Sequence, residues 1–327
     1  MLNPRENMFR TIYGEKPEYV PLSYTEIQYG GFFVMNVVGQ PLKNGTDIFG
    51  VPWIYGPEGG MPDPRRHPLA DIADWRRLLP EMPDLSGIDF KALAAKEKEA
   101  ANYHKEDKIY SIMDDGGVFM RLTYLMGIQE ACIALLEDPD ECMNFFEAFT
   151  EWRIDYYNRV IDAYDPDVIV YGNDIATAGS LLLSQDLYRE MLKPFDRRIV
   201  EAVTSRGVIF DYHSCGKVES VIGDYIETGA RMWQSAQPIN DLVQILDTYS
   251  GKITVGGGWD TAGEASYLYP DTSDEVIRKE THRCLTTYKK PGYILWPLMY
   301  NEKGNARIFG DPRLGALYEQ WEEDRWF

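Results

Sequence analysis

The stretch Val208-Ile209-Phe210-Asp211-Tyr212-His213-Ser214-Cys215-Gly216 passes from an apolar run directly into polar side chains. The β-branched and aromatic residues at its start predict a buried strand, Val208–Tyr212. In a barrel of parallel strands, the carboxyl ends of all strands open on one face. An imidazole and a thiol two residues apart at such an end can converge on one point. The stretch therefore predicts a parallel α/β fold with His213 and Cys215 on its functional face.

Other parts of the chain repeat this alternation of short apolar runs and amphipathic helical stretches, most clearly from Asp107 onward. Repeated strand and helix units of this kind are typical of a parallel sheet covered by helices. We predict an α/β fold of the (β/α)8 TIM-barrel type with an N-terminal cap or extension. The further candidate strands are Val20–Tyr24, Ile109–Met113, Asp167–Tyr171, Arg231–Ser235, Ile253–Val255 and Tyr293–Trp296.

The length of 327 residues fits a single domain, because α/β barrels commonly exceed about 250 residues as one unit. Residues before about 107 differ from the remainder, since Gly- and Pro-rich turns such as Gly56–Pro64 interrupt the periodic pattern. We therefore expect one barrel domain over residues 1–327, in which residues 1–106 include a lid or extension.

The formal net charge of −19 makes a nucleic acid or an anionic membrane surface an unfavourable partner. No stretch approaches the roughly 18 consecutive apolar residues of a membrane span, and the N-terminus lacks the apolar run of a signal peptide. We expect a cytoplasmic protein. Its four cysteines are widely spaced, so we expect free thiols or metal ligands rather than disulfides.

Polar residues also follow three other candidate strands. Asp114 follows the strand that ends at Met113, Asn173 and Asp174 follow the one that ends at Tyr171, and Trp259 and Asp260 follow a run of three glycines. Each aspartate could cap the next helix, or it could serve a site shared with His213 and Cys215. Several such strand ends together favour a shared site.

The sequence resembles the uroporphyrinogen decarboxylase superfamily over nearly its whole length. That superfamily comprises the decarboxylase and methyltransferases of cobalamin-dependent methanol, methylamine and aryl-ether metabolism. The resemblance implies a TIM barrel whose C-terminal face holds the active site. It rests on Lys16–Pro21, Thr46–Trp53, His67–Leu69, Asn173-Asp174, Ser184–Tyr188, Lys193–Phe195, His213–Gly216 and Gly257–Asp260.

The two branches of the superfamily differ in their charged and metal-binding residues. The decarboxylase branch carries an Arg-rich N-terminal motif for the carboxylates of its tetrapyrrole, and here only Arg5 and Arg10 lie nearby. The methyltransferase branch holds zinc with a His-x-Cys and a distant Cys near the last strand. His213 and Cys215 match the first pair, whereas Glu302 stands in the region of the distant Cys. Zinc also accepts carboxylates, so Glu302, Asp174 or Asp260 could complete the site.

The resemblance thus implies a methyltransferase that moves a methyl group between a small substrate and the cobalamin of a partner corrinoid protein. The substrate could be a methoxyaromatic compound, an alcohol or an amine, or the acceptor a thiol or folate. The alternatives are a decarboxylase and a non-catalytic metal- or corrinoid-binding barrel. The expected catalytic residues are Asp174, Asp260 and Tyr212, the substrate-binding residues Asn173, Trp259 and Asp114, and the zinc ligands His213, Cys215 and Glu302.

Overall fold

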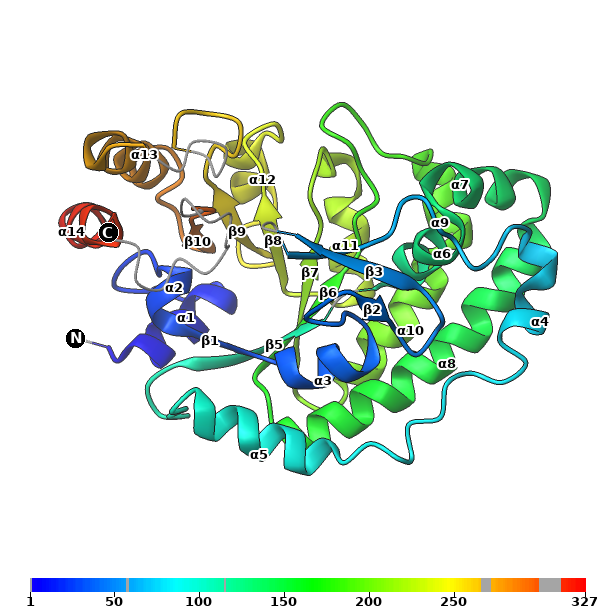
Figure 1. Cartoon of the computed structure of the whole chain (residues 1–327). Coiled ribbons are helices and arrows are strands. Elements are labelled where there is room, and N and C mark those ends of the chain that lie inside the picture. Colours follow the sequence, from blue (N-terminus) through cyan, green and yellow to red (C-terminus); the bar gives the residue numbers. More distant parts are fainter. Residues whose placement is uncertain (1, 57–58, 115, 266–271, 300–312) are drawn as a thin grey trace.

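The computed structural model describes residues 2–56, 59–114, 116–265, 272–299 and 313–327. In these residues, seven parallel strands form the main sheet, in the order β1-β5-β6-β7-β8-β9-β10 (Figure 1). The strands are β1 Ile27–Gly30, β5 Ile109–Asp114, β6 Val168–Gly172, β7 Ile209–His213, β8 Met232–Ala236, β9 Thr254–Gly258 and β10 Tyr293–Trp296.

The two edges of this sheet approach each other where the chain enters β1. An isolated parallel bridge joins Leu22 to Leu295 of β10, and the Leu295 amide donates a hydrogen bond of 2.9 Å to Pro21. The sheet therefore curls into a TIM-type barrel, and the predicted fold class is confirmed, with seven strands in the described part of the main sheet.

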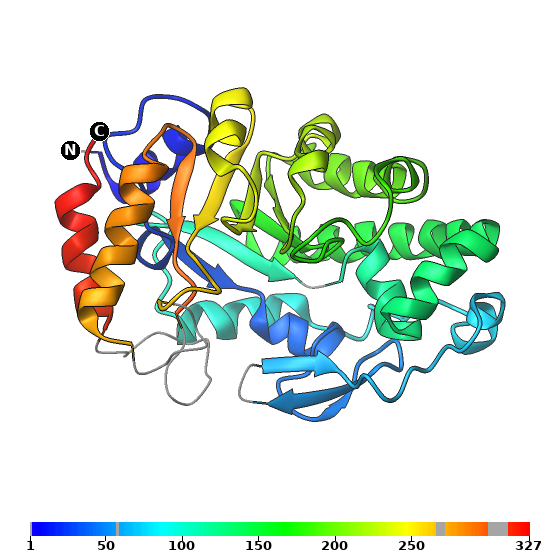
Figure 2. The ribbon, with the colours of Figure 1, turned by 90° about the horizontal axis from the view of Figure 1, so that it is seen from above.

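Helices surround the strands and connect them. They are α1 Pro4–Ile12, α2 Ser23–Glu26, α3 Phe32–Val38, α4 Trp75–Leu78, α5 Phe90–Ala100, α6 Val118–Met126, α7 Ile128–Glu137, α8 Pro139–Tyr164, α9 Gln185–Met191, α10 Lys193–Thr204, α11 Ile222–Thr228, α12 Leu242–Thr248, α13 Asp274–Thr287 and α14 Leu314–Asp324. Both termini lie on the same side of the molecule, as Figure 2 shows. Of the described helices, none alone is long and apolar enough to cross a membrane, and only α6 and α7 joined across a sharp bend meet that test.

At the end where the strands begin, the barrel interior is filled by one side chain from the first or second position of most strands. Ile27, Ile109, Val168, Ile209, Met232 and Ile294 pack together there. Met8 and Ile12 of α1 join this cluster, so α1 covers the end of the barrel at which the strands begin. The functional groups must therefore lie at the other end, where the strands terminate.

The first predicted strand, Val20–Tyr24, is wrong. Leu22 makes only an isolated bridge, and the chain then forms the single helical turn α2 before β1 begins at Ile27. The buried Glu26 side chain stabilises this turn, because its carboxyl group accepts a hydrogen bond of 3.1 Å from the Leu22 amide. A side chain that satisfies the backbone locally competes here with strand pairing.

The three glycines after Val255 lie within β9, although the predicted strand stopped at Val255. A Cβ atom at Gly257 would lie 2.2 Å from the Ala236 carbonyl oxygen, and one at Gly256 would lie 2.7 Å from the Trp296 ring. Glycine is required at both positions because neighbouring backbone and ring atoms fill the space of a side chain. The glycine run is therefore a packing feature of the barrel.

Residues before β5 also form a small antiparallel sheet of β2 Gly45–Thr46, β3 Pro52–Gly56 and β4 Gly59–Pro62. Figure 2 shows this sheet, in blue and cyan, outside the barrel strands. The buried Asp47 carboxylate attaches it to the barrel layer, because it accepts bonds of 2.6 Å from Arg121 of α6 and 3.2 Å from the Trp53 indole.

A pH-dependent loss of stability is expected from Glu26. Burial raises the pKa of this carboxyl to about 8, so the folded protein retains a proton that the unfolded chain releases above its ordinary pKa near 4.5. The contribution of Glu26 is therefore fully favourable below pH 4.5 and is lost as the pH rises to 8, at about 1.4 kcal/mol per pKa unit. Glu26→Gln should remove this component. Urea unfolding at pH 5 and pH 8.5 measures it, and an unchanged pH dependence in the variant would contradict the assignment.

Candidate functional site

Asp174, His213 and Cys215 meet at the open end of the barrel. Asp174 follows β6 by two residues, His213 is the last residue of β7, and Cys215 follows it by two residues. One oxygen, one nitrogen and the sulfur of these side chains lie within 4.8 Å of one another, and all three side chains are partly exposed. The predicted convergence of His213 and Cys215 is present, and Asp174 joins them.

Hydrogen bonds of backbone amides between the two strand ends fix this arrangement. The Cys215 amide donates a bond of 2.7 Å to the Asp174 carboxylate, and the Asn173 amide donates one of 2.9 Å to the His213 carbonyl. Gly216 has a φ of +82°, and a Cβ atom there would lie 2.7 Å from the Thr177 carbonyl oxygen. The sequence His-Ser-Cys-Gly is therefore suited to a tight turn that brings the thiol back toward the imidazole.

Neighbouring groups raise the pKa of the His213 imidazole. Burial lowers its pKa, but the hydrogen bond and charge of Cys215 and the charge of Asp174 raise it, with a net value of about 10. Its Nε2 atom lies 3.8 Å from the Cys215 sulfur. An imidazole between two groups that can carry negative charge marks a position suited to a cation.

The donor set fits a zinc ion. Zinc binds thiolate sulfur, imidazole nitrogen and carboxylate oxygen, and catalytic zinc sites use three protein ligands with one open position. Cys215, His213 and Asp174 supply one donor of each type from the C-terminal barrel face. Glu302, the expected third ligand, lies outside the described residues.

Asp260 and Trp259 lie after β9 and are engaged in their own loop. The Asp260 carboxylate accepts a bond of 3.0 Å from the Ala262 amide, and its own amide donates one of 2.7 Å to Glu280. The buried Trp259 indole donates to the Ala265 carbonyl at 3.0 Å. The structure does not group Asp260 with the three potential ligands.

Tyr212 and Asn173 point away from the barrel interior, into the layer between sheet and helices. The Tyr212 ring stacks on Tyr225 with centroids 4.0 Å apart, and both rings are buried. The Asn173 amide donates to Asp196 of α10 at 3.2 Å. These side chains were expected in the pocket, and they instead pack behind the loops that carry His213 and Asp174.

Asp114 is also engaged by protein groups. Its buried carboxylate accepts bonds of 2.6 Å from both the Arg153 guanidinium and the Tyr157 hydroxyl of α8. Burial raises the pKa of Asp114, while Arg153 and Tyr157 oppose this effect. The contacts give Asp114 a structural role at the end of β5.

Two residues of β8 that were not predicted contact the site. The Gln234 side-chain oxygen lies 3.1 Å from His213 Nδ1, and the Ser235 hydroxyl lies 3.3 Å from the Cys215 sulfur. Both residues are buried. The sequence could have indicated both residues, because they stand at the end of the predicted strand Arg231–Ser235, which follows the strand that leads to His213.

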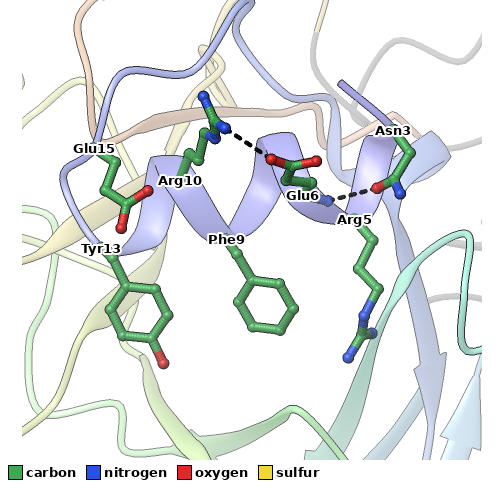
Figure 3. A pocket seen from close by; sticks show the side chains of 7 residues that line it. All are labelled: Asn3, Arg5, Glu6, Phe9, Arg10, Tyr13 and Glu15. Atoms are coloured by element: carbon green, nitrogen blue, oxygen red, sulfur yellow. Dashed lines mark hydrogen bonds and ion pairs between the residues drawn. The ribbon is translucent and has the colours of Figure 1, made fainter. Parts of the chain in front are cut away.

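A surface hollow of about 330 Å³ runs along α1, where Figure 3 shows Arg5, Phe9 and Tyr13 projecting from one side of the helix. Both of its arginines already have partners, because Arg10 pairs with Glu6 and Arg5 pairs with Asp167. Since α1 covers the end where the strands begin, this hollow lies opposite the Asp174, His213 and Cys215 group.

Comparisons with known proteins point to one family. The sequence model of the family described as uroporphyrinogen decarboxylase (URO-D) matches residues 46–297. A solved structure described as a methyltransferase from Methanosarcina mazei is similar in fold, with a TM-score of 0.68, 15% sequence identity and 99% of each chain covered. No curated protein matches the sequence.

Removing the Arg153 charge should destabilise the fold strongly. Arg153→Met leaves the buried Asp114 carboxylate without its cation, which typically costs about 3–5 kcal/mol. Arg159→Met on the same helix is the matched control, because the exposed pair of Arg159 with Asp155 should contribute less than about 1 kcal/mol. The double variant Arg153→Met with Asp114→Asn should recover part of the loss. Equal unfolding free energies for the two single variants in urea would contradict this assignment.

Proposed function

The chain belongs to the uroporphyrinogen decarboxylase family, and from this premise we propose that it is a methyltransferase. It moves a methyl group between a small substrate and the cobalamin of a partner corrinoid protein in the cytoplasm. The observation that carries the proposal is the convergence of Asp174, His213 and Cys215 at the open end of the barrel. The similarity in fold to a protein described as a methyltransferase supports it.

The three converging side chains would hold zinc. A zinc ion bound there would act as a Lewis acid on the heteroatom that loses or gains the methyl group. Cys215 would bind as a thiolate, His213 through the nitrogen facing Cys215, and Asp174 through an oxygen while it accepts the Cys215 amide. The barrel residues thereby orient the substrate, and the cobalamin carries the difficult chemistry.

The charge pattern disfavours the alternative of a decarboxylase acting on a tetrapyrrole with many carboxylates. Such a substrate needs several arginines directed into the pocket. Arg5 is bound to Asp167 and Arg10 to Glu6, both on α1 at the closed end of the barrel. Methyl donors consistent with the proposal are methoxyaromatic compounds, alcohols and amines, and the reaction of a methoxyaromatic compound would be an O-demethylation. In the opposite direction of transfer, the acceptor would be a thiol or folate.

The proposed zinc site predicts the metal content of single variants. His213→Ala and Cys215→Ala should each lower bound zinc well below one ion per chain and leave the helical content intact, because ligands on barrel loops contribute little to the core. Cys132→Ala, at a partly exposed thiol on α7 outside the ligand group, is the control and should retain zinc. Metal analysis with circular dichroism measures both quantities. Full zinc content in both ligand variants would refute the site.

The choice of the third ligand is tested in the same way with Asp174→Asn and Glu302→Gln. The contacts of Asp174 predict that its variant loses more zinc than the Glu302 variant. Zinc loss in the Glu302 variant alone would instead favour the ligand set expected from the sequence.

Turnover should depend on the Asp174 charge. Asp174→Asn retains an oxygen for the Cys215 amide and removes the charge, so methyl transfer should fall by roughly a hundredfold with little change in thermal midpoint. Asp260→Asn is the matched control, because Asp260 caps its own turn and should be dispensable for transfer. The assay uses a corrinoid protein and a panel of methoxyaromatic compounds, alcohols and amines, with uroporphyrinogen as a substrate expected to remain unchanged. Near-normal transfer by the Asp174 variant would remove it from the site.

A further inference from the structure

Strand β8 is irregular beside the candidate site. Its pairing with β9 shifts register between Gln234 and Ala236, and Ser235 has a φ of +65°. In a regular strand, consecutive side chains point to opposite faces. Here Gln234 and Ser235 both contact groups at the end of β7. The irregularity therefore directs two consecutive side chains of β8 to the same site.

The Gln234 contact determines which nitrogen of His213 is free. A side-chain amide oxygen can only accept, so the proton of the 3.1 Å bond belongs to His213 Nδ1. In the neutral imidazole, the form that binds a metal, the lone pair of Nε2 is then directed to the side of Cys215, which is 3.8 Å away. Gln234 is only 1% exposed, so water does not compete effectively for this bond.

The Ser235 contact acts on the sulfur. Its hydroxyl lies 3.3 Å from Cys215 Sγ and can donate to a thiolate, which withdraws charge from the sulfur. A non-glycine residue with positive φ costs on the order of 1 kcal/mol, and persists only where the surroundings impose it. The strained backbone thus places the Ser235 hydroxyl beside the Cys215 sulfur, which a regular strand would not do.

We propose that the Gln234-Ser235 irregularity of β8 is a positioning device for the metal centre. Gln234 holds the His213 tautomer that can bind a metal, and Ser235 sets the electron donation of the Cys215 thiolate. This inference rests on the metal centre of the proposed function. Gln234 and Ser235 are positioning residues, since they act through the ligands.

The test uses Co²⁺ and Zn²⁺ with the purified full-length protein. Gln234→Leu should weaken metal affinity about 10- to 100-fold, and Gln234→Glu, which keeps an acceptor oxygen, should restore most of it. Gln237→Leu is the control, because Gln237 contacts the Gly216 amide and Thr261 but no ligand side chain. The affinity of the Gln237→Leu variant for Co²⁺ and Zn²⁺ should differ from that of the wild type by less than about threefold.

Two variants separate the Ser235 hydrogen bond from the strain. Ser235→Ala and Ser235→Gly should both move the thiolate-to-cobalt charge-transfer band to lower energy, because an unbonded sulfur donates more readily. Only glycine relieves the positive φ, so its thermal midpoint should exceed that of the alanine variant. If the band shifts equally in both variants while their thermal midpoints differ, the lost hydrogen bond and not the backbone strain causes the shift.

The failure of this inference differs from the failure of the proposed function. A wild-type protein that binds neither metal removes the metal centre and the positioning device with it. Wild-type binding with unchanged affinity in Gln234→Leu and an unchanged band in Ser235→Ala refutes the positioning device alone. An effect of Gln237→Leu as large as that of Gln234→Leu also refutes it, since general loosening of the loop would then be the cause.

Discussion

The 2.7 Å hydrogen bond from the Cys215 amide to the Asp174 carboxylate connects the ends of β6 and β7, and the rest of the site depends on it. It places a carboxylate oxygen beside the thiol and holds the turn that brings the thiol toward His213. The parallel pairing of Gly172 with His213 provides the register for this contact. A shift of one residue would move the imidazole to the helix-facing side of the sheet.

A buried polar layer behind the loops supports this arrangement. Asn173 donates to Asp196, which also accepts a bond of 2.8 Å from the Tyr171 hydroxyl, while Asp114 pairs with Arg153 one strand away. Such pairs cost desolvation, and their value lies in geometry more than in net stability. The residue before Asp174 is thereby fixed from the helix side, so the site is held from both faces of the sheet.

The sequence predicted the parts of the molecule that depend on local pattern. Tyr293–Trp296 was predicted with its observed bounds, because apolar β-branched and aromatic runs indicate buried strands whatever their neighbours. His213 and Cys215 were predicted as neighbours from their position at a strand end. Alternation along β7 would also have placed Tyr212 opposite to His213, since consecutive side chains face opposite sides of a strand.

Other features depend on pairings between distant segments and could not be read from local pattern. The pairing of Asp114 with Arg153 joins residues 39 positions apart, and Gln234 reaches His213 only through the register of β8 with β7. The turn at Ser23–Glu26 interrupts an apolar run because the buried Glu26 carboxyl group bonds to the Leu22 amide. In each case a side-chain contact decides between structures that the apolar pattern permits equally.

The proposed ligand set also explains how the site can lack the distant cysteine expected from the superfamily resemblance. A neutral imidazole, a thiolate and a carboxylate together carry two negative charges, which balance the charge of Zn²⁺ as a set with two thiolates would. An oxygen donor is harder than sulfur and gives less charge to the metal, so the remaining position stays more electrophilic. In the proposed site, the Ser235 hydroxyl would act in the same direction by drawing charge from the only thiolate in the set. In the proposed zinc site, both features would favour activation of a weakly basic heteroatom such as an ether or alcohol oxygen, because such an atom requires the stronger Lewis acid.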